Sequence, residues 1–315
     1  MNRAGVAMLV VVVAALGGAS AVQADHDPTT ECFGVTQTII GTPANDVITG
    51  TPANDVIKAG AGDDMVDGAG GNDIICGEDG NDTLVGGPGD DALSGDAGDD
   101  QVDGSEDPNG DDFDIAFFHL APVPITADLS TSTATGWGTD RIANFEGLVG
   151  SPHGDFLTGD ANVNLMDGRA GNDTISAGAG DDGLDGDEGN DVLDGGPGVD
   201  LAFFDYSPNP VVASLASKTA RGWGSDTLRG IEDLHGSQRS DVLVGNGGPN
   251  LLNGHQGGDR IMGGGGPDRI LGEGGMDRLF GGPGGDRLVG GLGKDYVDGG
   301  GSRDVCIGER KKRCP

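Results

Sequence analysis

Aromatic and basic residues are both scarce in this chain of 315 residues. Phe, Trp and Tyr together make up 4% of the sequence, and 18 Lys and Arg stand against 52 Asp and Glu, for a net charge of −34. A globular domain of this length normally buries many more large apolar side chains. The composition therefore excludes a conventional globular core and, taken alone, is typical of a disordered chain.

The shortage of positive charge also limits the partners. Nucleic acids and anionic lipid surfaces would repel a chain that is this acidic, so we expect neither as the main partner. The same excess of acid attracts cations. The charge balance therefore predicts a cation-binding protein.

Glycine is abundant, with 64 residues, and it recurs on a nine-residue period. The stretch GEDGNDTLVGGPGDDALSG, residues 77–95, shows the period twice. Glycine stands at position one and often at positions two and four, Asp at position six, and an aliphatic residue at position eight. Three blocks of such nonapeptides occupy residues 41–103, 150–200 and 236–307. A repeat architecture is the usual way for such a composition to fold.

The period itself predicts a coil of parallel strands. Positions seven to nine form a short strand, and side-chain alternation turns only the eighth residue inward. The glycines before it supply the positive φ angles that reverse the chain. Two nonapeptides then make one coil, and coils stack about 4.8 Å apart along their strands. Position-six carboxylates eighteen residues apart, such as those of Asp73 and Asp91, are expected to lie one above the other.

Such a column of carboxylates needs a counter-charge. Like charges at this spacing repel by about 1 kcal/mol per pair even in water. Ca²⁺ takes six to eight oxygen ligands, which carboxylates and turn carbonyls can supply, whereas Mg²⁺ requires a tighter octahedron and keeps its waters. The repeat therefore predicts multiple Ca²⁺ ions bound at the turns.

The pattern G-G-x-G-x-D-x-U-x resembles the calcium-binding repeat of the haemolysin-type, or repeats-in-toxin, family. The resemblance implies an all-β parallel β-roll solenoid with Ca²⁺ held between the turns of neighbouring coils. It also implies the ligands, carried over to position six of each copy: Asp64, Asp73, Asp82, Asp91, Asp100, Asp173, Asp182, Asp191, Asp200, Asp259, Asp268, Asp277, Asp286 and Asp295. The alternative, that these residues are merely solvated turn residues, is disfavoured because turns accept Asn and Ser equally well.

Several copies depart from the pattern, and their sites are expected to be weaker. Thr-Pro-Ala replaces the glycines before Asp46 and Asp55. Three further copies lack glycine at position four, and two have Asn at position six, which keeps an oxygen but loses the charge. These are Asp155, Asp241 and Asp304, and Asn164 and Asn250.

Two related segments interrupt the repeats. The sequences that begin at Asp114 and at Asp200 match each other at an offset of 86, and they contain Trp137 and Trp223. Alternating residues at 123–127 and 211–215 predict strands longer than those of the repeats. We expect wider coils that continue the solenoid, with both Trp side chains in the core; the alternative is a sugar-binding role for exposed Trp side chains.

The first 24 residues have the order of a secretory signal peptide: Arg3, an apolar run, and small residues before residue 25. An uncleaved membrane anchor is the alternative. Export permits disulfides, and Cys32, Cys76, Cys306 and Cys314 allow three pairings. We favour Cys32–Cys76 and Cys306–Cys314, which would close the two ends of a solenoid.

Arginine rows mark the third block. Arg260, Arg269, Arg278 and Arg287 occupy position seven and should face outward, with Arg260 over Arg278 and Arg269 over Arg287. Solvated edges that offset the acidic turns explain them; an anion- or glycan-binding face is the alternative.

No catalytic motif accompanies the repeats. The sequence has neither the H-E-x-x-H of zinc proteases nor a G-x-S-x-G elbow, and its glycine-rich runs lead into short strands instead of the helix of a phosphate loop. Because the repeats fill most of the chain, we expect no catalytic residues and no toxin or protease domain, and hence no enzyme.

These observations predict a secreted, extracellular protein that folds on Ca²⁺ and serves as a binding or scaffold module. A surface adhesin or glycan-binding protein, whose partner would be a cell surface or a polysaccharide, is the alternative; an enzyme with an unrecognised site is a third. After signal cleavage no membrane span is expected. The expected organisation is a signal peptide (1–24), N-terminal cap (25–40), first repeat block (41–103), first interrupting segment (104–149), second repeat block (150–200), second interrupting segment (201–235), third repeat block (236–307) and basic tail (308–315).

Overall fold

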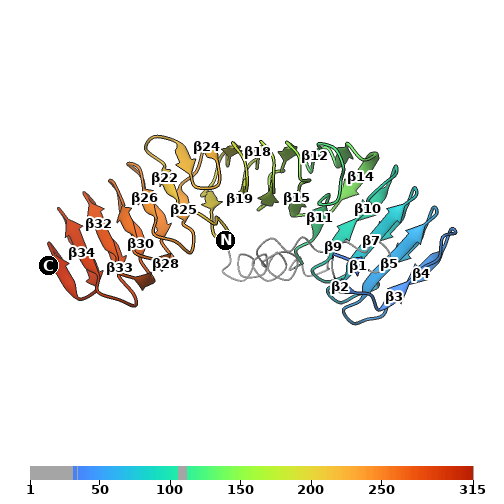
Figure 1. The fold of residues 1–315 in the computed structure, drawn as a ribbon, viewed down its shortest axis with the longest axis horizontal. Helices are drawn as coiled ribbons and strands as arrows, with labels where there is room; N and C mark the ends of the chain where they lie inside the picture. The colour runs from blue at the N-terminus through green and yellow to red at the C-terminus, as the bar shows by residue number, and fades with distance from the viewer. Residues whose placement is uncertain (1–30, 34, 106–111, 315) are drawn as a thin grey trace. The chain divides into compact units, whose positions relative to one another are not determined.

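The computed structural model describes residues 31–33, 35–105 and 112–314, and every regular element in these ranges is a β-strand (Figure 1). The predicted signal peptide lies outside the described residues. Within the described ranges the chain forms no helix with the length and apolar character needed to cross a bilayer. The chain divides into two compact units, Met1–Arg169 and Ala170–Pro315.

The first unit is built from two parallel sheets whose strands alternate along the chain. Each strand pairs with the equivalent strand one coil on; Ile57 of one coil, for example, faces Ile75 of the next. One sheet contains β3 (Ile39–Ile40), β5 (Val56–Ala61), β7 (Ile74–Asp79), β9 (Ala92–Ser94), β11 (Ile115–Phe117), β15 (Gly147–Val149) and β17 (Leu165–Asp167). The other contains β4 (Val47–Thr49), β6 (Met65–Asp67), β8 (Thr83–Val85), β10 (Gln101–Asp103), β12 (Thr126–Asp128), β13 (Thr133–Thr135), β14 (Thr139–Ala143) and β16 (Phe156–Thr158).

The second unit repeats this architecture. Its first sheet contains β19 (Gly183–Asp185), β21 (Leu201–Phe203), β25 (Asp233–His235), β27 (Leu251–Asn253), β30 (Arg269–Leu271), β33 (Arg287–Val289) and β35 (Val305–Ile307). Its second contains β18 (Thr174–Ser176), β20 (Val192–Asp194), β22 (Val212–Ser214), β23 (Thr219–Arg221), β24 (Ser225–Arg229), β26 (Val242–Val244), β29 (Arg260–Met262), β32 (Arg278–Gly282), β34 (Tyr296–Gly300) and β36 (Arg310–Lys312). The short strands β28 (Gln256–Gly257) and β31 (Gly274–Gly275) pair beside them. The predicted all-β parallel solenoid of two nonapeptides per coil is confirmed.

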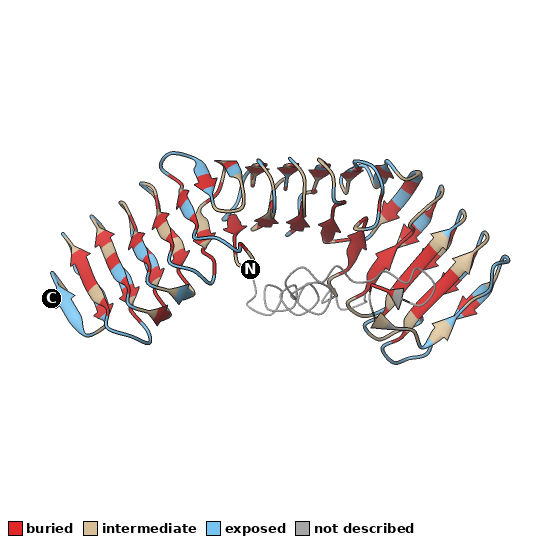
Figure 2. Ribbon diagram, in the orientation of Figure 1, coloured by how far each residue is buried: buried red, intermediate tan, exposed pale blue. Residues whose placement is uncertain are grey.

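Position eight of the repeat forms the interior. In most strands the central residue is buried and its neighbours are more exposed, which Figure 2 shows as buried bands along the strands. Ile75, Leu84, Leu193, Leu243 and Leu288 all occupy this position, and none has any exposed surface. The core is therefore a stack of single aliphatic side chains, as the period predicts.

The interrupting segments continue the sheets through an antiparallel excursion. In the first unit β14 pairs in parallel with β10 and antiparallel with β13, β13 pairs antiparallel with β12, and β12 rejoins the parallel sheet at β16. In the second unit β20, β24, β23, β22 and β26 repeat this order. The expectation of longer strands at 123–127 and 211–215 is wrong: β12 and β22 have three residues each, because the chain turns back into a hairpin.

Neither tryptophan belongs to the core. Trp137 and Trp223 are both only half-buried, so the expectation that they fill a thicker interior is wrong. Phenylalanines take that place, since Phe117, Phe145 and Phe203 are no more than 5% exposed.

Both favoured disulfides are formed, Cys32–Cys76 and Cys306–Cys314. The first holds the hairpin of β1 (Glu31–Cys32) and β2 (Val35–Thr36) against the outer face of the first sheet, because Cys76 is an outward-facing residue of β7. Phe33 of this hairpin packs edge-on against Phe117, with ring centroids 4.8 Å apart. The bridge thus covers a sheet face as well as fixing the start of the solenoid.

The arginine rows lie as expected. Arg260 faces Arg278 across neighbouring strands, and Arg269 faces Arg287. All four side chains are exposed.

Candidate metal centres

The position-six carboxylates form buried columns along each unit. In most copies the backbone N–H of this residue donates to Oδ1 of the equivalent residue one coil on, as from Asp64 to Asp82 at 2.8 Å and from Asp73 to Asp91 at 2.7 Å. The fourteen residues predicted as ligands are each at most 3% exposed: Asp64, Asp73, Asp82, Asp91, Asp100, Asp173, Asp182, Asp191, Asp200, Asp259, Asp268, Asp277, Asp286 and Asp295. The stacking that the period predicts is therefore present, and the carboxylates are far more buried than solvated turn residues.

The second carboxylate oxygen is the distinctive feature of these columns. While Oδ1 accepts the backbone hydrogen bond, Oδ2 is buried and has no hydrogen-bond partner. This holds for Asp64, Asp73, Asp82, Asp91, Asp100, Asp114, Asp191, Asp200, Asp259, Asp268, Asp277, Asp286, Asp295 and Asp304. A buried carboxylate oxygen without a partner is costly. Its regular recurrence indicates positions for a ligand.

The glycine at position one makes room for that oxygen. A Cβ atom on Gly77 would lie closer than 3.0 Å both to Oδ2 of Asp82 and to the carbonyl oxygen of Gly95. Gly86 stands in the same relation to Asp91 and to the carbonyl of Gly104. Two oxygens from neighbouring coils therefore converge where glycine has no side chain.

The electrostatics of the columns favour a cation. Burial, reinforced by neighbouring carboxylates, raises the pKa of Asp91 to about 8 and that of Asp114 to about 9. Burial also raises the pKa of Asp100 and of Asp259 to about 7. The ion pair between Lys58 and Glu78 lies outside the columns. Burial thus removes water from the ionised carboxylates, and this ion pair supplies them with no positive charge.

A residue with a hydroxyl at position two bonds the carboxylate in four of the copies that depart from the pattern. Thr42 donates from its N–H and its Oγ1 to Oδ2 of Asp46, and Thr51 does the same for Asp55. Ser151 and Ser237 bond both oxygens of Asp155 and Asp241. These carboxylates are satisfied within their own turn, and weaker metal binding there stays a prediction.

The two Asn residues behave in a related way. The side-chain oxygen of Asn164 accepts the N–H of Asp160, and that of Asn250 accepts the N–H of Asn246. Asp304 differs, since its Oδ2 is buried without a hydrogen bond in spite of the missing glycine. In its hydrogen bonding it therefore resembles the main columns.

The columns also pass through the interrupting segments, which sequence reasoning missed. In the first unit Asp100 donates to Asp140, Asp91 to Asp114, and Asp114 to Glu146. In the second unit Asp226 and Glu232 accept in the same manner from Asp191 and Asp200. Glu309 of the tail accepts from Asp295. A signal existed: at the offset of 86, Asp114 aligns with Asp200, which was among the predicted ligands.

The donor set fits Ca²⁺. The columns offer carboxylate oxygens, and the convergent carbonyls belong to turn glycines, so that all candidate ligands are hard oxygen atoms. Ca²⁺ prefers such ligands in large number and flexible geometry. Bound there, it would supply the positive charge that the Oδ2 atoms lack.

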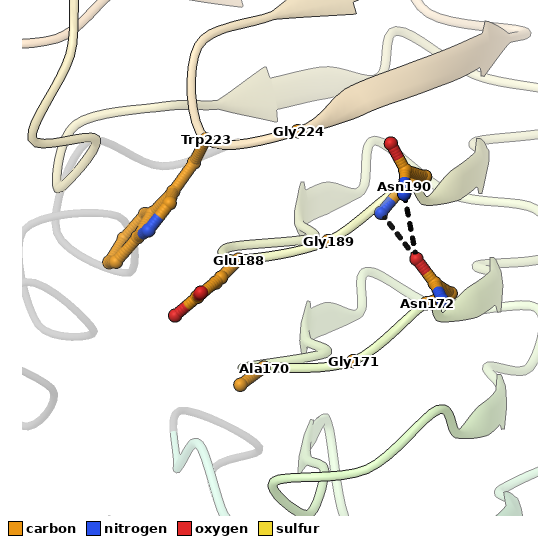
Figure 3. Close-up of a pocket in the computed structure, with 8 residues that line it drawn as sticks. All are labelled: Ala170, Gly171, Asn172, Glu188, Gly189, Asn190, Trp223 and Gly224. Carbon is orange, nitrogen blue, oxygen red and sulfur yellow. Dashed lines mark hydrogen bonds between the residues drawn. The ribbon is translucent and has the colours of Figure 1, made fainter.

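A shallow pocket in the second unit borders a column, because Asn172 and Asn190 in its lining directly precede Asp173 and Asp191 (Figure 3). It has a volume of about 410 Å³ and is lined by Trp223 and Glu188 and by Asn172 and Asn190. Asn190 donates to the side-chain oxygen of Asn172 at 3.0 Å. An aromatic ring beside amide and carboxylate groups can contact a polar ligand.

Comparison with known proteins agrees with this geometry. A sequence model described as the RTX calcium-binding nonapeptide repeat, in four copies, matches residues 40–75, 77–112, 149–184, 167–202, 235–270 and 271–306. These stretches cover more than half of the chain and coincide with the three repeat blocks. No curated protein matches the sequence. The calcium-binding repeat is a structural arrangement and not an enzyme family, and the chain belongs to the family of proteins built from RTX calcium-binding nonapeptide repeats.

Proposed function

We propose that this is a secreted calcium-binding protein whose solenoid folds when Ca²⁺ occupies the position-six columns. The observation that carries the proposal is the recurrence, in both units, of a buried Oδ2 atom with no hydrogen bond, beside a convergent carbonyl at turns such as those of Asp82 and Asp91. The proposed ligands are the fourteen predicted aspartates, joined by Asp114 and Asp304.

The energetics support coupling of metal binding to folding. One buried aliphatic side chain per nonapeptide contributes about 1.5–3 kcal/mol. Ordering each of the nine residues costs roughly 1–2 kcal/mol of backbone entropy. Backbone hydrogen bonds recover part of this cost, but the buried carboxylates add to it. Metal binding must therefore supply folding free energy.

The compartment follows from the same coupling. Calcium modules of extracellular proteins bind with dissociation constants of about 10⁻⁴–10⁻³ M. With such affinities the chain stays unfolded before export and folds outside the cell, where its disulfides also form. The signal-like segment at 1–24 supports this reading, and the folded solenoid then serves as a binding or scaffold module without catalytic activity.

Two measurements test this proposal. Native mass spectrometry of the purified protein in calcium should give several ions per chain, and fractionation with N-terminal sequencing of the mature protein should give an extracellular chain that begins after residue 21 or 24. A chain that binds no calcium, or one retained inside the cell with Met1 intact, contradicts the proposal.

Glycan binding is the second candidate, and the pocket at Trp223 favours it (Figure 3). Half-exposed aromatic rings stack on the apolar faces of sugars, while Asn and Glu side chains bond hydroxyl groups. Under this alternative, Trp fluorescence of the calcium-loaded protein responds to polysaccharide, and the response is lost in Trp223→Ala but kept in Trp137→Ala. Identical responses of all three proteins, or none, exclude a glycan site at this pocket.

A further inference from the structure

Two histidines and an aspartate meet in the second unit, away from the calcium columns. Asp205 follows β21 by two residues, His235 ends β25, and His255 follows β27 by two residues. These three strands are neighbours in one sheet, since β25 pairs with both β21 and β27. The sheet therefore brings together residues that are 50 positions apart in the sequence.

The geometry of the three side chains is that of a metal-ligand set. Nε2 of His255 lies 2.6 Å from Oδ1 of Asp205, and Nδ1 of His235 lies 3.9 Å from Oδ2. One ligand atom from each residue falls within 4.8 Å of the others. Two ligands of a tetrahedral Zn²⁺, each about 2.0–2.1 Å from the metal, lie about 3.3 Å apart. The two observed separations, each to a different oxygen of Asp205, lie on either side of this value.

Negative charge gathers around the His255 imidazole. Its Nε2 atom is buried, and the carboxylate of Asp205 lies 2.6 Å from it. The charge of Asp205 acts on this side chain most strongly, followed by the charges of Glu273 and Asp241. An excess of negative charge at this place attracts a cation.

The first unit supplies an internal comparison. At the offset of 86, His119, Val149 and Arg169 occupy the places of Asp205, His235 and His255. There the outer face is apolar: Val149 belongs to the cluster that Phe33 and Phe117 form, and the His119 ring stacks on Phe33. The same fold therefore carries an apolar cluster in one copy and metal-binding side chains in the other.

We propose that Asp205, His235 and His255 form a binding site for one divalent transition-metal ion, such as Zn²⁺, distinct from the calcium columns. Imidazole nitrogen suits Zn²⁺ and its neighbours in the transition series, whereas Ca²⁺ takes oxygen ligands. Three protein ligands leave a fourth position open to water. The side chains retain 15–22% of their exposure, which gives a metal ion access from solvent.

The test uses the full mature protein in millimolar Ca²⁺, which occupies the carboxylate columns. Titration calorimetry with Zn²⁺ and elemental analysis after gel filtration should give one tightly bound Zn²⁺ per chain. Co²⁺ in its place should show the visible bands of a four-coordinate site with nitrogen ligands.

Matched variants come from the chain itself. His235→Val and His255→Arg copy the residues at the equivalent places of the first unit, so the fold accommodates them; Arg169 even shares the positive φ angle of His255, 65° against 63°. Removal of a residue that only supports a metal ligand weakens metal binding by about 10–100-fold. Each of these variants removes a ligand itself and should weaken Zn²⁺ binding by more than that. His153→Ala, which removes a histidine elsewhere, should bind Zn²⁺ as the wild type does.

Circular dichroism in Ca²⁺ confirms that each variant is folded, and Asp205→Asn provides a third, milder change. Absence of tight Zn²⁺ binding by the wild-type protein overturns the proposal. So does Zn²⁺ binding that the three site variants leave unchanged or that His153→Ala abolishes.

Discussion

At the scale of the residue, the two carboxylate oxygens of a position-six aspartate differ in their contacts. Oδ1 bonds the neighbouring coil, and Oδ2 is left for a ligand unless a hydroxyl at position two takes it, as Thr51 does for Asp55. The buried columns could be predicted from the nonapeptide, because each regular copy places its aspartate in the same way. The hydrogen bond from a hydroxyl at position two could not be predicted, because it depends on which carboxylate oxygen faces the turn.

Replacement of a column aspartate should have opposite effects with and without calcium. Asp82→Asn keeps the oxygen that accepts the N–H of Asp64 but removes a buried charge. In Ca²⁺ it should destabilise the protein by about 3 kcal/mol, as when one partner of a buried ion pair is lost. Without Ca²⁺ it should be neutral or stabilising, because the repulsion within the column falls.

Asp79→Asn is the control for that change. Asp79 lies in the same repeat, carries the same charge and is exposed. Thermal unfolding in calcium and in chelator should hardly distinguish this variant from the wild type. Equal effects of Asp82→Asn and Asp79→Asn would mean that the column carboxylates do not bind the metal.

A methyl group at position one should disturb the same site from the other side. In Gly77→Ala the new Cβ meets Oδ2 of Asp82 and the carbonyl of Gly95, and overpacking of this kind costs about 1–3 kcal/mol. We expect a lower melting temperature in calcium and a higher calcium concentration at the folding midpoint. Gly247→Ala, where a Cβ meets nothing within 4 Å, should leave both unchanged or slightly improved. Equal losses in the two variants would contradict this account of the turn.

At the scale of the element, the strands of the repeats could be predicted from the nine-residue period. The structure of the interrupting segments could not. Alternation fixes position eight as the inward residue, so the repeat strands and their register could be predicted. In the interrupting segments the alternation around Val211 is also compatible with a hairpin, and the structure shows one between β22 and β23. Pairing partners decide between the two, and local sequence does not contain them.

The columns also predict a pH effect on the metal-free protein. Burial raises the pKa of Asp91 to about 8 and of Asp114 to about 9, above the ordinary value of 3.8. Between pH 3.8 and these raised pKa values, the folded state therefore binds more protons than the unfolded chain. Its stability rises as the pH falls through this range. Asp298 has the opposite effect on stability, because the hydrogen bond from Arg313 lowers its pKa. That effect is confined to pH values below 3.8.

Dialysed, metal-free protein should accordingly gain β-structure or melt at a higher temperature at pH 5 than at pH 8, while its calcium affinity declines. Circular dichroism at the two pH values measures both effects. A metal-free protein that becomes less stable on acidification from pH 8 to pH 5 would contradict the assignment of the buried carboxylates.

At the scale of the whole molecule, each unit carries one disulfide. The pairing Cys32–Cys76 and Cys306–Cys314 could be favoured from the positions of the cysteines near the two ends. What could not be predicted was the cover that the first bridge provides, with Phe33 against Phe117, because the hairpin before the repeats has no pattern of its own. The metal-ligand cluster at Asp205 also escaped sequence reasoning, since three strands must pair before its members meet.

The two bridges should differ in their contribution to stability. Their sequence separations are 44 and 8 residues, for which chain entropy gives about 4 and about 2.5 kcal/mol. Replacing Cys32 and Cys76 by Ser should therefore lower the stability of the calcium-loaded protein more than replacing Cys306 and Cys314, and should also expose Phe33. Chemical denaturation of the two double variants measures the difference; a larger loss from the second pair would contradict this order.

The central claim is that metal at the carboxylate columns supplies the free energy that the narrow aliphatic core cannot. A far-UV circular dichroism titration with Ca²⁺ tests it most directly, starting from protein in chelator at pH 7.5. We expect a disordered spectrum that converts to a β-rich one as calcium approaches millimolar concentration. A spectrum that is β-rich from the start and unchanged by calcium would contradict the account.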